Sequence, residues 1–271
     1  MPSKGKVKAK TKKPHILLIL FFIGAVIFFL YEELGKEGIQ RGILDILKPE
    51  EKPPALPKVA IVIDDLGPSK KAALEVFNIM APLTLSIFPN ETYTAWIAEE
   101  GHSLGYDIIG HIPMEAKEPR KLGKGGLYTW MSQEEIHKTL KENISSIPHI
   151  KGISNHMGSA FTEDERAMHD LMGGLKREGL FFLDSLTTGK SVGVRVANAE
   201  GIRALRRDVF LDEKDNPEDI KAQWENVVKT AKKRGYAIAI AHPKKNTIEF
   251  LKNTLIRNEV TLVPISELSI P

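Results

Sequence analysis

The sequence has no cysteine among its 271 residues. This absence excludes disulfide bonds, metal sites built from thiolates and a cysteine nucleophile, and it agrees with an exported protein that needs no disulfide framework. A glycine-rich phosphate loop is also missing from the place where a dinucleotide-binding fold has one. The first strand-like run ends in IDDLGPS, where the carboxylates of Asp64 and Asp65 would repel a phosphate group. A Rossmann-type nucleotide site is therefore not indicated.

Charge is distributed unevenly, although the formal net charge is only +3. Residues 1–15 contain six lysines and no acid, residues 16–31 are an unbroken run of apolar residues and glycine, and Glu32 follows. This pattern predicts a basic cytoplasmic tail (1–15) and a single-pass transmembrane signal-anchor (16–31) in the inner membrane, with the rest of the chain on the periplasmic side. Cleavage by signal peptidase is the alternative, although no A-x-A-like site follows Tyr31. Because topology accounts for the lysines, nucleic acid is not an expected partner.

Residues 32–57 lead from this predicted span to the main domain. They begin with a short amphipathic pattern and end in KPEEKPPALPK, which is rich in proline and charge and opens no hydrophobic period. We interpret them as a juxtamembrane segment followed by a linker. Residues 58–271 are then one domain, long enough for a substantial core. Nothing in the sequence indicates an oligomeric state.

The domain alternates short apolar runs with longer helical patterns, and several runs are apolar throughout, as in strands covered by helices on both faces. The stretch SVGVRVANAEG (191–201) alternates like a strand but lies where a helix is due, and we assign it to a helix. Repeated βα units predict an α/β fold, and a distorted seven- to eight-stranded (β/α) barrel is favoured over an open doubly wound sheet. The expected strands cover residues 59–64, 83–88, 107–112, 152–157, 180–185, 207–212, 236–242 and 260–266.

Almost every reactive side chain lies at the C-terminal end of one of these runs. In a barrel these ends meet on one face, where the active sites of such enzymes lie. Taken singly, each residue has an ordinary explanation, such as a helix cap or a packed histidine, but their joint placement favours a site. Asp65, His111 and His156 make a three-ligand set suited to a divalent metal, above all Zn²⁺, with a fourth position for water. The full set is Asp64, Asp65, His111, Glu115, Asn155, His156, Asp184, Asp212 and His242.

Six ordered motifs resemble those of the divergent polysaccharide deacetylases, a bacterial branch of the polysaccharide deacetylase superfamily. They extend over roughly residues 58–268. The resemblance implies a distorted seven-stranded β/α barrel and metal-assisted removal of acetyl groups from a carbohydrate. The motifs are VAIVIDDLG, HIPME, GISNHMGSAF, FFLDSLTT, RRDVFLD and AIAIAHP.

The resemblance also implies roles for single residues. The paired aspartates of the superfamily's first motif correspond to Asp64 as the base and Asp65 as a metal ligand. Its second motif has two histidines four residues apart; His111 matches the first, but Glu115 stands at the second position. Either Glu115 or His156 then completes the ligand set, and His156 is preferred because zinc favours imidazole over a second carboxylate.

The late histidine of the superfamily corresponds to His242, the candidate general acid. Its arginine-proline motif is missing, and Arg207 is the candidate that would position the base instead. Asp184 would orient His242 or hydrogen-bond the sugar.

The predicted function is metal-dependent deacetylation of an N- or O-acetylated cell-envelope polysaccharide, with the membrane as a second partner. Two alternatives stay open. One is a metal-free glycoside hydrolase that uses carboxylates such as Asp64 and Asp184. The other is a catalytically degenerate barrel that binds glycan or an envelope partner.

Overall fold

The structure is a computed structural model that describes residues 14–47, 56–254 and 259–268. The chain divides into two compact units, residues 1–55 and 56–271. Most of the predicted basic tail and of the predicted proline-rich linker lie outside the described residues.

In the first unit, helix α1 (Pro14–Leu47) is interrupted at Gly35, whose φ of 61° and ψ of 170° are not helical. Across the described parts of the chain, no helix is long and apolar enough to cross a membrane. The transmembrane span predicted over residues 16–31 is therefore not supported by the structure.

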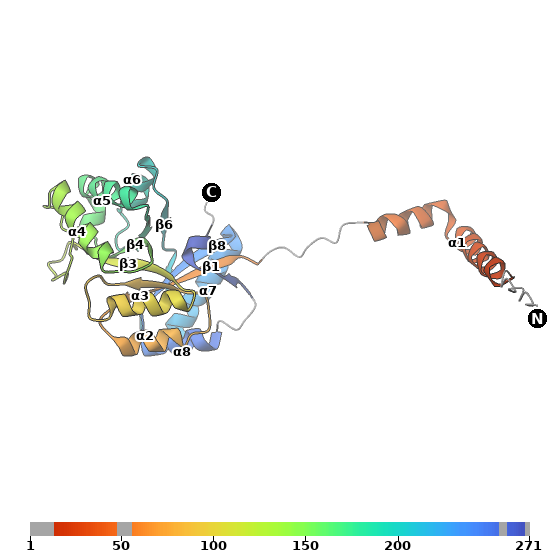
Figure 1. The fold of residues 1–271 in the computed structure, drawn as a ribbon, viewed down its shortest axis with the longest axis horizontal. Helices are drawn as coiled ribbons and strands as arrows, with labels where there is room; N and C mark the ends of the chain where they lie inside the picture. Colours follow the sequence, from red (N-terminus) through yellow and green to blue (C-terminus); the bar gives the residue numbers. More distant parts are fainter. Residues whose placement is uncertain (1–13, 48–55, 255–258, 269–271) are drawn as a thin grey trace, which may run out of the picture. The chain divides into compact units, whose positions relative to one another are not determined.

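The second unit is a curled, mostly parallel sheet with helices packed on its outer side (Figure 1). This confirms the predicted α/β class. The described strands are β1 (Lys58–Leu66), β2 (Thr84–Ile87), β3 (Asp107–Met114), β4 (Ile150–Met157), β5 (Phe181–Asp184), β6 (Ala204–Arg206), β7 (Val209–Phe210), β8 (Tyr236–Ala241) and β9 (Thr261–Leu262).

Local sequence signals define where the helices begin and end. Ser132 and Glu135 form a capping box before α4, and Asn216 caps α7 with proline next to it. Gly179 and Gly235 end α5 and α7 in the left-handed conformation that glycine tolerates. The described helices of this unit are α2 (Lys70–Phe77), α3 (Thr94–Ser103), α4 (Gln133–Ser145), α5 (Glu165–Glu178), α6 (Gly193–Ala199), α7 (Pro217–Arg234), α8 (Lys245–Thr254) and the short 3₁₀ turns η1 (Phe161–Glu163) and η2 (Ile265–Glu267).

The strand order β6-β5-β4-β3-β2-β1-β8-β7 leaves β6 and β7 as the two ends of the sheet. No ladder joins these two strands within the described residues, so the sheet is a curled half-barrel and not a closed barrel. The strand expected over 207–212 is present only as β7, because Arg207 and Asp208 lie between the two short strands β6 and β7. Arg207 N donates to Asp184 O of β5, whereas Asp208 N donates to Ile238 O of β8. The amides of these two consecutive residues thus bond to strands near opposite ends of the sheet. The chain crosses the gap between β6 and β7, here called the seam, without a ladder that joins the two strands.

Alternation along the strands separates two apolar layers. On the outer face, Ile61, Leu85 and their neighbours pack under α2, α3, α7 and α8, while a second cluster packs under α4, α5 and α6. On the inner face, Val62 and Ile240 belong to a core that the C-terminal residues Ile265 and Leu268 complete. The helix expected within residues 191–201 is confirmed as α6.

Candidate functional site

The inner face becomes polar toward the C-terminal ends of the strands. Ile109 and Val62 belong to the inner apolar cluster, and two residues further along each strand stand His111 and Asp64. Because side chains two residues apart share a face, these groups lie above the inner core. Both are almost completely buried. The site is therefore built on rigid, hydrogen-bonded strands, as active sites on parallel β/α sheets are.

Asp64 and Asp65 are adjacent, and a regular strand would point them to opposite faces. The pairing of β1 with β2 is irregular between Ile63 and Leu66, and Asp65 has a left-handed backbone with φ of 60°. This local irregularity turns Asp65 toward the histidines on β3 and β4. A non-glycine residue with positive φ is uncommon, and such strain concentrates at functional sites.

Asp65, His111 and His156 converge on one point. Asp65 Oδ1 lies 3.2 Å from His111 Nε2 and 3.2 Å from His156 Nδ1. The two ring nitrogens are themselves 3.1 Å apart. One potential ligand atom from each residue lies within 4.8 Å of those of the other two. These are the three residues that the sequence favoured as a ligand set.

The donor set fits a divalent cation. Asp65 Oδ1 is buried and has no hydrogen-bond partner within the described structure. A buried carboxylate oxygen without a donor is costly unless a cation compensates it. Burial disfavours the charge on Asp65, but His111 and His156 outweigh it and hold the pKa of this carboxyl well below its usual range. One carboxylate and two imidazoles are a common ligand combination for Zn²⁺ and its neighbours in the first transition row.

Contacts behind the ligands fix the orientation of His111. Its Nδ1 lies 2.8 Å from Ser154 Oγ, which is in turn 2.8 Å from Ser86 Oγ. Ser154 is the residue opposite His111 in the pairing of β3 with β4. Phe88 contacts both rings, with centroids 5.0 Å from His111 and 4.7 Å from His156. This arrangement directs His111 Nε2 toward Asp65, as supporting contacts do around ligating histidines.

Asp64 lies beside the ligand set. Its Oδ1 is 3.5 Å from His111 Nδ1 and has no hydrogen-bond partner within the described residues. Burial raises the pKa of Asp64, and the opposing effects of His111 and Ser86 do not cancel this rise. A carboxylate whose pKa is raised accepts a proton more readily than an ordinary one, which suits a general base.

His242, the residue directly after β8, approaches the same cluster. Asp212 holds it twice, because Asp212 Oδ1 lies 2.8 Å from His242 Nδ1 and Oδ2 accepts from the His242 amide at 2.8 Å. Thr247 also donates to Oδ2. His242 Nε2 is left facing Asp65 Oδ2 at 3.9 Å. Burial disfavours the imidazolium, but Asp212 more than compensates and raises the pKa of His242, while the pKa of Asp212 is lowered.

Asp184 does not contact His242, although the sequence analysis offered it as the orienting group. Its Oδ1 accepts from the Leu186 amide at 2.8 Å and its Oδ2 from Ser191 Oγ at 2.6 Å. The reason is parity, because Phe182 of β5 packs in the outer cluster and Asp184 shares its face. The carboxylate that orients His242 is Asp212.

Arg207 does not reach Asp64 through any hydrogen bond within the described residues. Its Nε donates to Ser185 O at 2.7 Å and its Nη2 to Leu186 O at 3.0 Å. Leu186 has φ of 50°, a strained conformation for a leucine. Arg207 therefore fastens the turn that follows β5 to the seam of the sheet.

Glu115 and Asn155 also make contacts other than metal ligation. Glu115 Oε2 accepts from both the amide and the hydroxyl of Thr129, at 2.7 and 2.6 Å. Asn155 Oδ1 accepts from the Ser185 amide, and its Nδ2 donates to Met157 O. Both residues connect neighbouring segments at the rim of the site.

Ser185 is a residue that the sequence analysis missed. Leu183 belongs to the inner core, so Ser185, two residues later, stands on the site-facing side. Its Oγ is buried and has no hydrogen-bond partner among the described residues. The sequence signal for Ser185 is its place in FFLDSLTT, one position after Asp184, which was assigned to the site instead.

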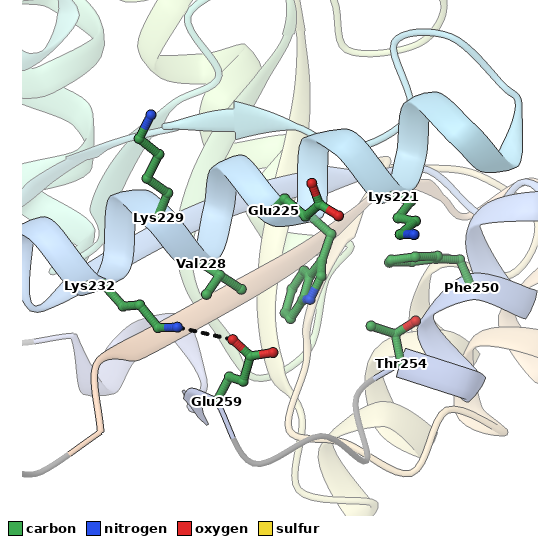
Figure 2. Close-up of a pocket in the computed structure, with 9 residues that line it drawn as sticks. Lys221, Glu225, Val228, Lys229, Lys232, Phe250, Thr254 and Glu259 are labelled. Atoms are coloured by element: carbon green, nitrogen blue, oxygen red, sulfur yellow. Dashed lines mark hydrogen bonds and ion pairs between the residues drawn. The ribbon is translucent and has the colours of Figure 1, made fainter.

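A separate pocket lies away from this face, between α7 and α8 (Figure 2). It has a volume of ≈ 550 Å³, and its lining includes Trp224, Phe250 and Lys221. None of the candidate catalytic or ligand residues contributes to it.

The fold and site together define a β/α half-barrel protein with a candidate metal centre at the carboxyl ends of its strands. A family model for the divergent polysaccharide deacetylases matches residues 61–269. The chain belongs to the divergent polysaccharide deacetylase family, as its motifs predicted.

Two bacterial proteins are similar to this chain over most of its length. The uncharacterised protein YibQ of Escherichia coli (strain K12) is 32% identical over 213 residues, which are 78% of this chain and 67% of YibQ. An uncharacterised protein of Haemophilus influenzae is 37% identical over 213 residues, which cover 78% of this chain and 76% of that protein. A crystal structure of an uncharacterised protein from Agrobacterium tumefaciens has the same fold, with a TM-score of 0.76, 21% identity, and coverage of 87% of this chain and 98% of that one.

Proposed function

We propose that this protein is a metal-dependent deacetylase that acts on an N- or O-acetylated cell-envelope polysaccharide. The observation that carries the proposal is the buried, unpartnered Asp65 Oδ1 facing His111 Nε2 and His156 Nδ1, each at 3.2 Å. Membership of the divergent polysaccharide deacetylase family supplies the acetylated carbohydrate as the substrate class.

The residues divide the chemistry between them. A divalent cation held by Asp65, His111 and His156, with Zn²⁺ the best match to these ligands, would supply Lewis-acid activation of an acetyl carbonyl and of the attacking water. Asp64 accepts the proton that the water loses as its oxygen bonds to the carbonyl carbon. His242 donates a proton to the departing nitrogen or oxygen of the sugar as the bond to the acetyl carbon breaks. Acetate and the free amine or hydroxyl are the products.

His242 is suited to this role because its Nδ1 is committed to Asp212, which leaves Nε2 directed into the site. The pKa of His242 is raised, so that the imidazole retains its proton to higher pH. The glycoside hydrolase alternative is disfavoured because its second carboxylate, Asp184, bonds Ser191 and the Leu186 amide instead of facing Asp64. A domain that binds glycan without turnover is the remaining alternative.

We further propose that the domain works on the periplasmic side of the inner membrane. The proposal rests on the lysines of residues 1–15 and the apolar run 16–31, a combination that directs bacterial chains toward export.

The test of the activity is acetate release from acetylated envelope glycans by the metal-loaded protein, with Asp64→Asn as the inactive control. Acetate release by the wild type and its loss in Asp64→Asn would support a deacetylase. Binding of glycan and metal by both proteins, with no acetate from either, would favour the binding-only domain.

A further inference from the structure

A pair of aromatic side chains, one half-buried and one exposed, lies on the loop between β3 and α4. The rings of Tyr128 and Trp130 are stacked, with centroids 5.4 Å apart and an interplanar angle of 23°. Trp130 is 69% exposed, although tryptophan is usually largely buried. The residues from Tyr128 to Met131 form a turn closed by a hydrogen bond from Met131 N to Tyr128 O.

The turn is fastened at its centre. Thr129, between the two aromatic residues, donates its amide and its hydroxyl to Glu115 Oε2, and its carbonyl accepts from Arg166 Nη2 of α5. An ionised acceptor makes such hydrogen bonds stronger than neutral ones. These bonds fix the backbone between the two rings, while Trp130 stays exposed to solvent.

The pair lies at the same end of the sheet as the candidate metal centre. Leu127 pairs with Met114, the last residue of β3, which is three residues or about 10 Å along the strand from His111. Glu115 O accepts from the amides of Ala160 and Phe161, in the segment that follows His156. The turn is thus attached to the ends of the two strands that supply both histidines.

We propose that Tyr128 and Trp130 form a sugar-stacking platform that holds a pyranose ring of the glycan chain beside the metal centre. The C–H groups on one face of a pyranose suit a flat aromatic surface, while the tryptophan N–H and tyrosine O–H suit its hydroxyl groups. A surface fixed before binding loses little conformational entropy when the sugar docks. The identity of the ligand as a glycan rests on the proposed function, whereas the platform itself rests on the geometry of the turn.

This assignment explains why a glutamate occupies position 115. Its carboxylate positions the turn through the hydrogen bonds from Thr129 and does not touch the sugar. Glu115→Ala should therefore weaken glycan binding, and Glu115→Gln, which keeps an acceptor oxygen, should restore most of it.

The experiment measures binding of N-acetylglucosamine oligomers of increasing length to the full chain by calorimetry, without any requirement for turnover. We expect affinity to increase with length for the wild type and to fall about tenfold for Trp130→Ala, a typical loss when an aromatic anchor is removed. Trp130→Phe should retain most of the affinity. Met80→Ala, which removes an exposed apolar side chain from the loop after α2, is the matched control and should bind like the wild type.

Equal affinity of Trp130→Ala and the wild type would overturn the platform, as would a loss seen in Trp224→Ala alone, which would place the glycan in the pocket of Figure 2. The platform would also be overturned if the wild type bound no oligomer but bound lipid vesicles or a protein through Trp130. Oligomer binding that depends on Trp130 without any acetate release would support the platform and reject the deacetylase proposal.

Discussion

His156 Nδ1 lies 3.1 Å from His111 Nε2, where β3 and β4 run side by side. Two neutral imidazole nitrogens at this distance need a proton or a cation between them, and both also face Asp65 Oδ1 at 3.2 Å. The second histidine thus comes from the neighbouring strand and not from a position four residues along the same segment. The arrangement provides a three-ligand set even though Glu115 stands at that position.

The first prediction concerns the ligands. The wild-type protein should bind about one zinc-like ion per chain, and His111→Ala, His156→Ala and Asp65→Ala should each lose most of it, because three ligands leave no reserve. Elemental analysis and calorimetric titration would measure this. Glu115→Ala is the matched control and should keep its metal. Full occupancy in His156→Ala with loss in Glu115→Ala would show that the wrong third ligand is assigned.

The second prediction concerns Asp64. Asp64→Asn is nearly isosteric and leaves all three ligand side chains in place, so metal binding should persist. The amide cannot accept the proton of the attacking water, and acetate release should fall by roughly 10²–10⁴-fold. Parallel measurement of metal content and acetate would separate the two effects. Loss of metal in Asp64→Asn would place this residue among the ligands and contradict its assignment as the base.

The sequence predicted the β/α alternation and the convergence of the site because strand ends and hydrophobic periods are local signals. It also singled out Asp65, His111 and His156 as candidates, since each lies at or near the C-terminal end of an apolar strand-like run. Their mutual distances depend on register, and no local pattern specifies that Ser154 stands opposite His111.

Other features were missed because they depend on which face a side chain occupies. Asp184 follows an apolar run as Asp64 does, but the shorter β5 ends with Asp184 on the outer face and Ser185 on the inner one. The open seam between β6 and β7 could not be predicted from the sequence either. It arises because Arg207 and Asp208 bond opposite edges of the sheet, and pairing partners are far apart in sequence.

The third prediction concerns this seam. Arg207→Ala removes two charge-assisted hydrogen bonds to the carbonyls of Ser185 and Leu186 and should lower the free energy of unfolding by about 2 kcal/mol. Urea unfolding would measure the change. The exposed neighbour Arg206 provides the control, and Arg206→Ala should change stability by less than about 0.5 kcal/mol. Unchanged stability in Arg207→Ala with a specific loss of activity would instead assign Arg207 to positioning the base.

The fourth prediction concerns location. A phosphatase reporter that folds only outside the cytoplasm, fused after Pro271, should be active in cells. Deletion of residues 1–31 should abolish that activity, because it removes both the lysines and the apolar run. A fluorescent reporter that folds only in the cytoplasm provides the reciprocal control. Strong fluorescence from the full-length fusion would contradict a periplasmic domain.

The last prediction concerns the pH dependence that Asp212 gives to His242. Asp212 stabilises the imidazolium and raises the pKa of His242, so a proton donor at this position is lost only when pH rises through that raised pKa. Asp212→Asn removes the charge that favours the imidazolium and should lower the pKa of His242. The alkaline limb of kcat/KM on glycan should then move to lower pH, and NMR titration of the His242 ring should move in the same direction without any need for turnover. Thr247→Val keeps the charge of Asp212 and removes only one hydrogen bond to it, so its profile should stay close to that of the wild type. If the NMR titration shifts in Asp212→Asn while the alkaline limb stays in place, the proton donor is a group other than His242.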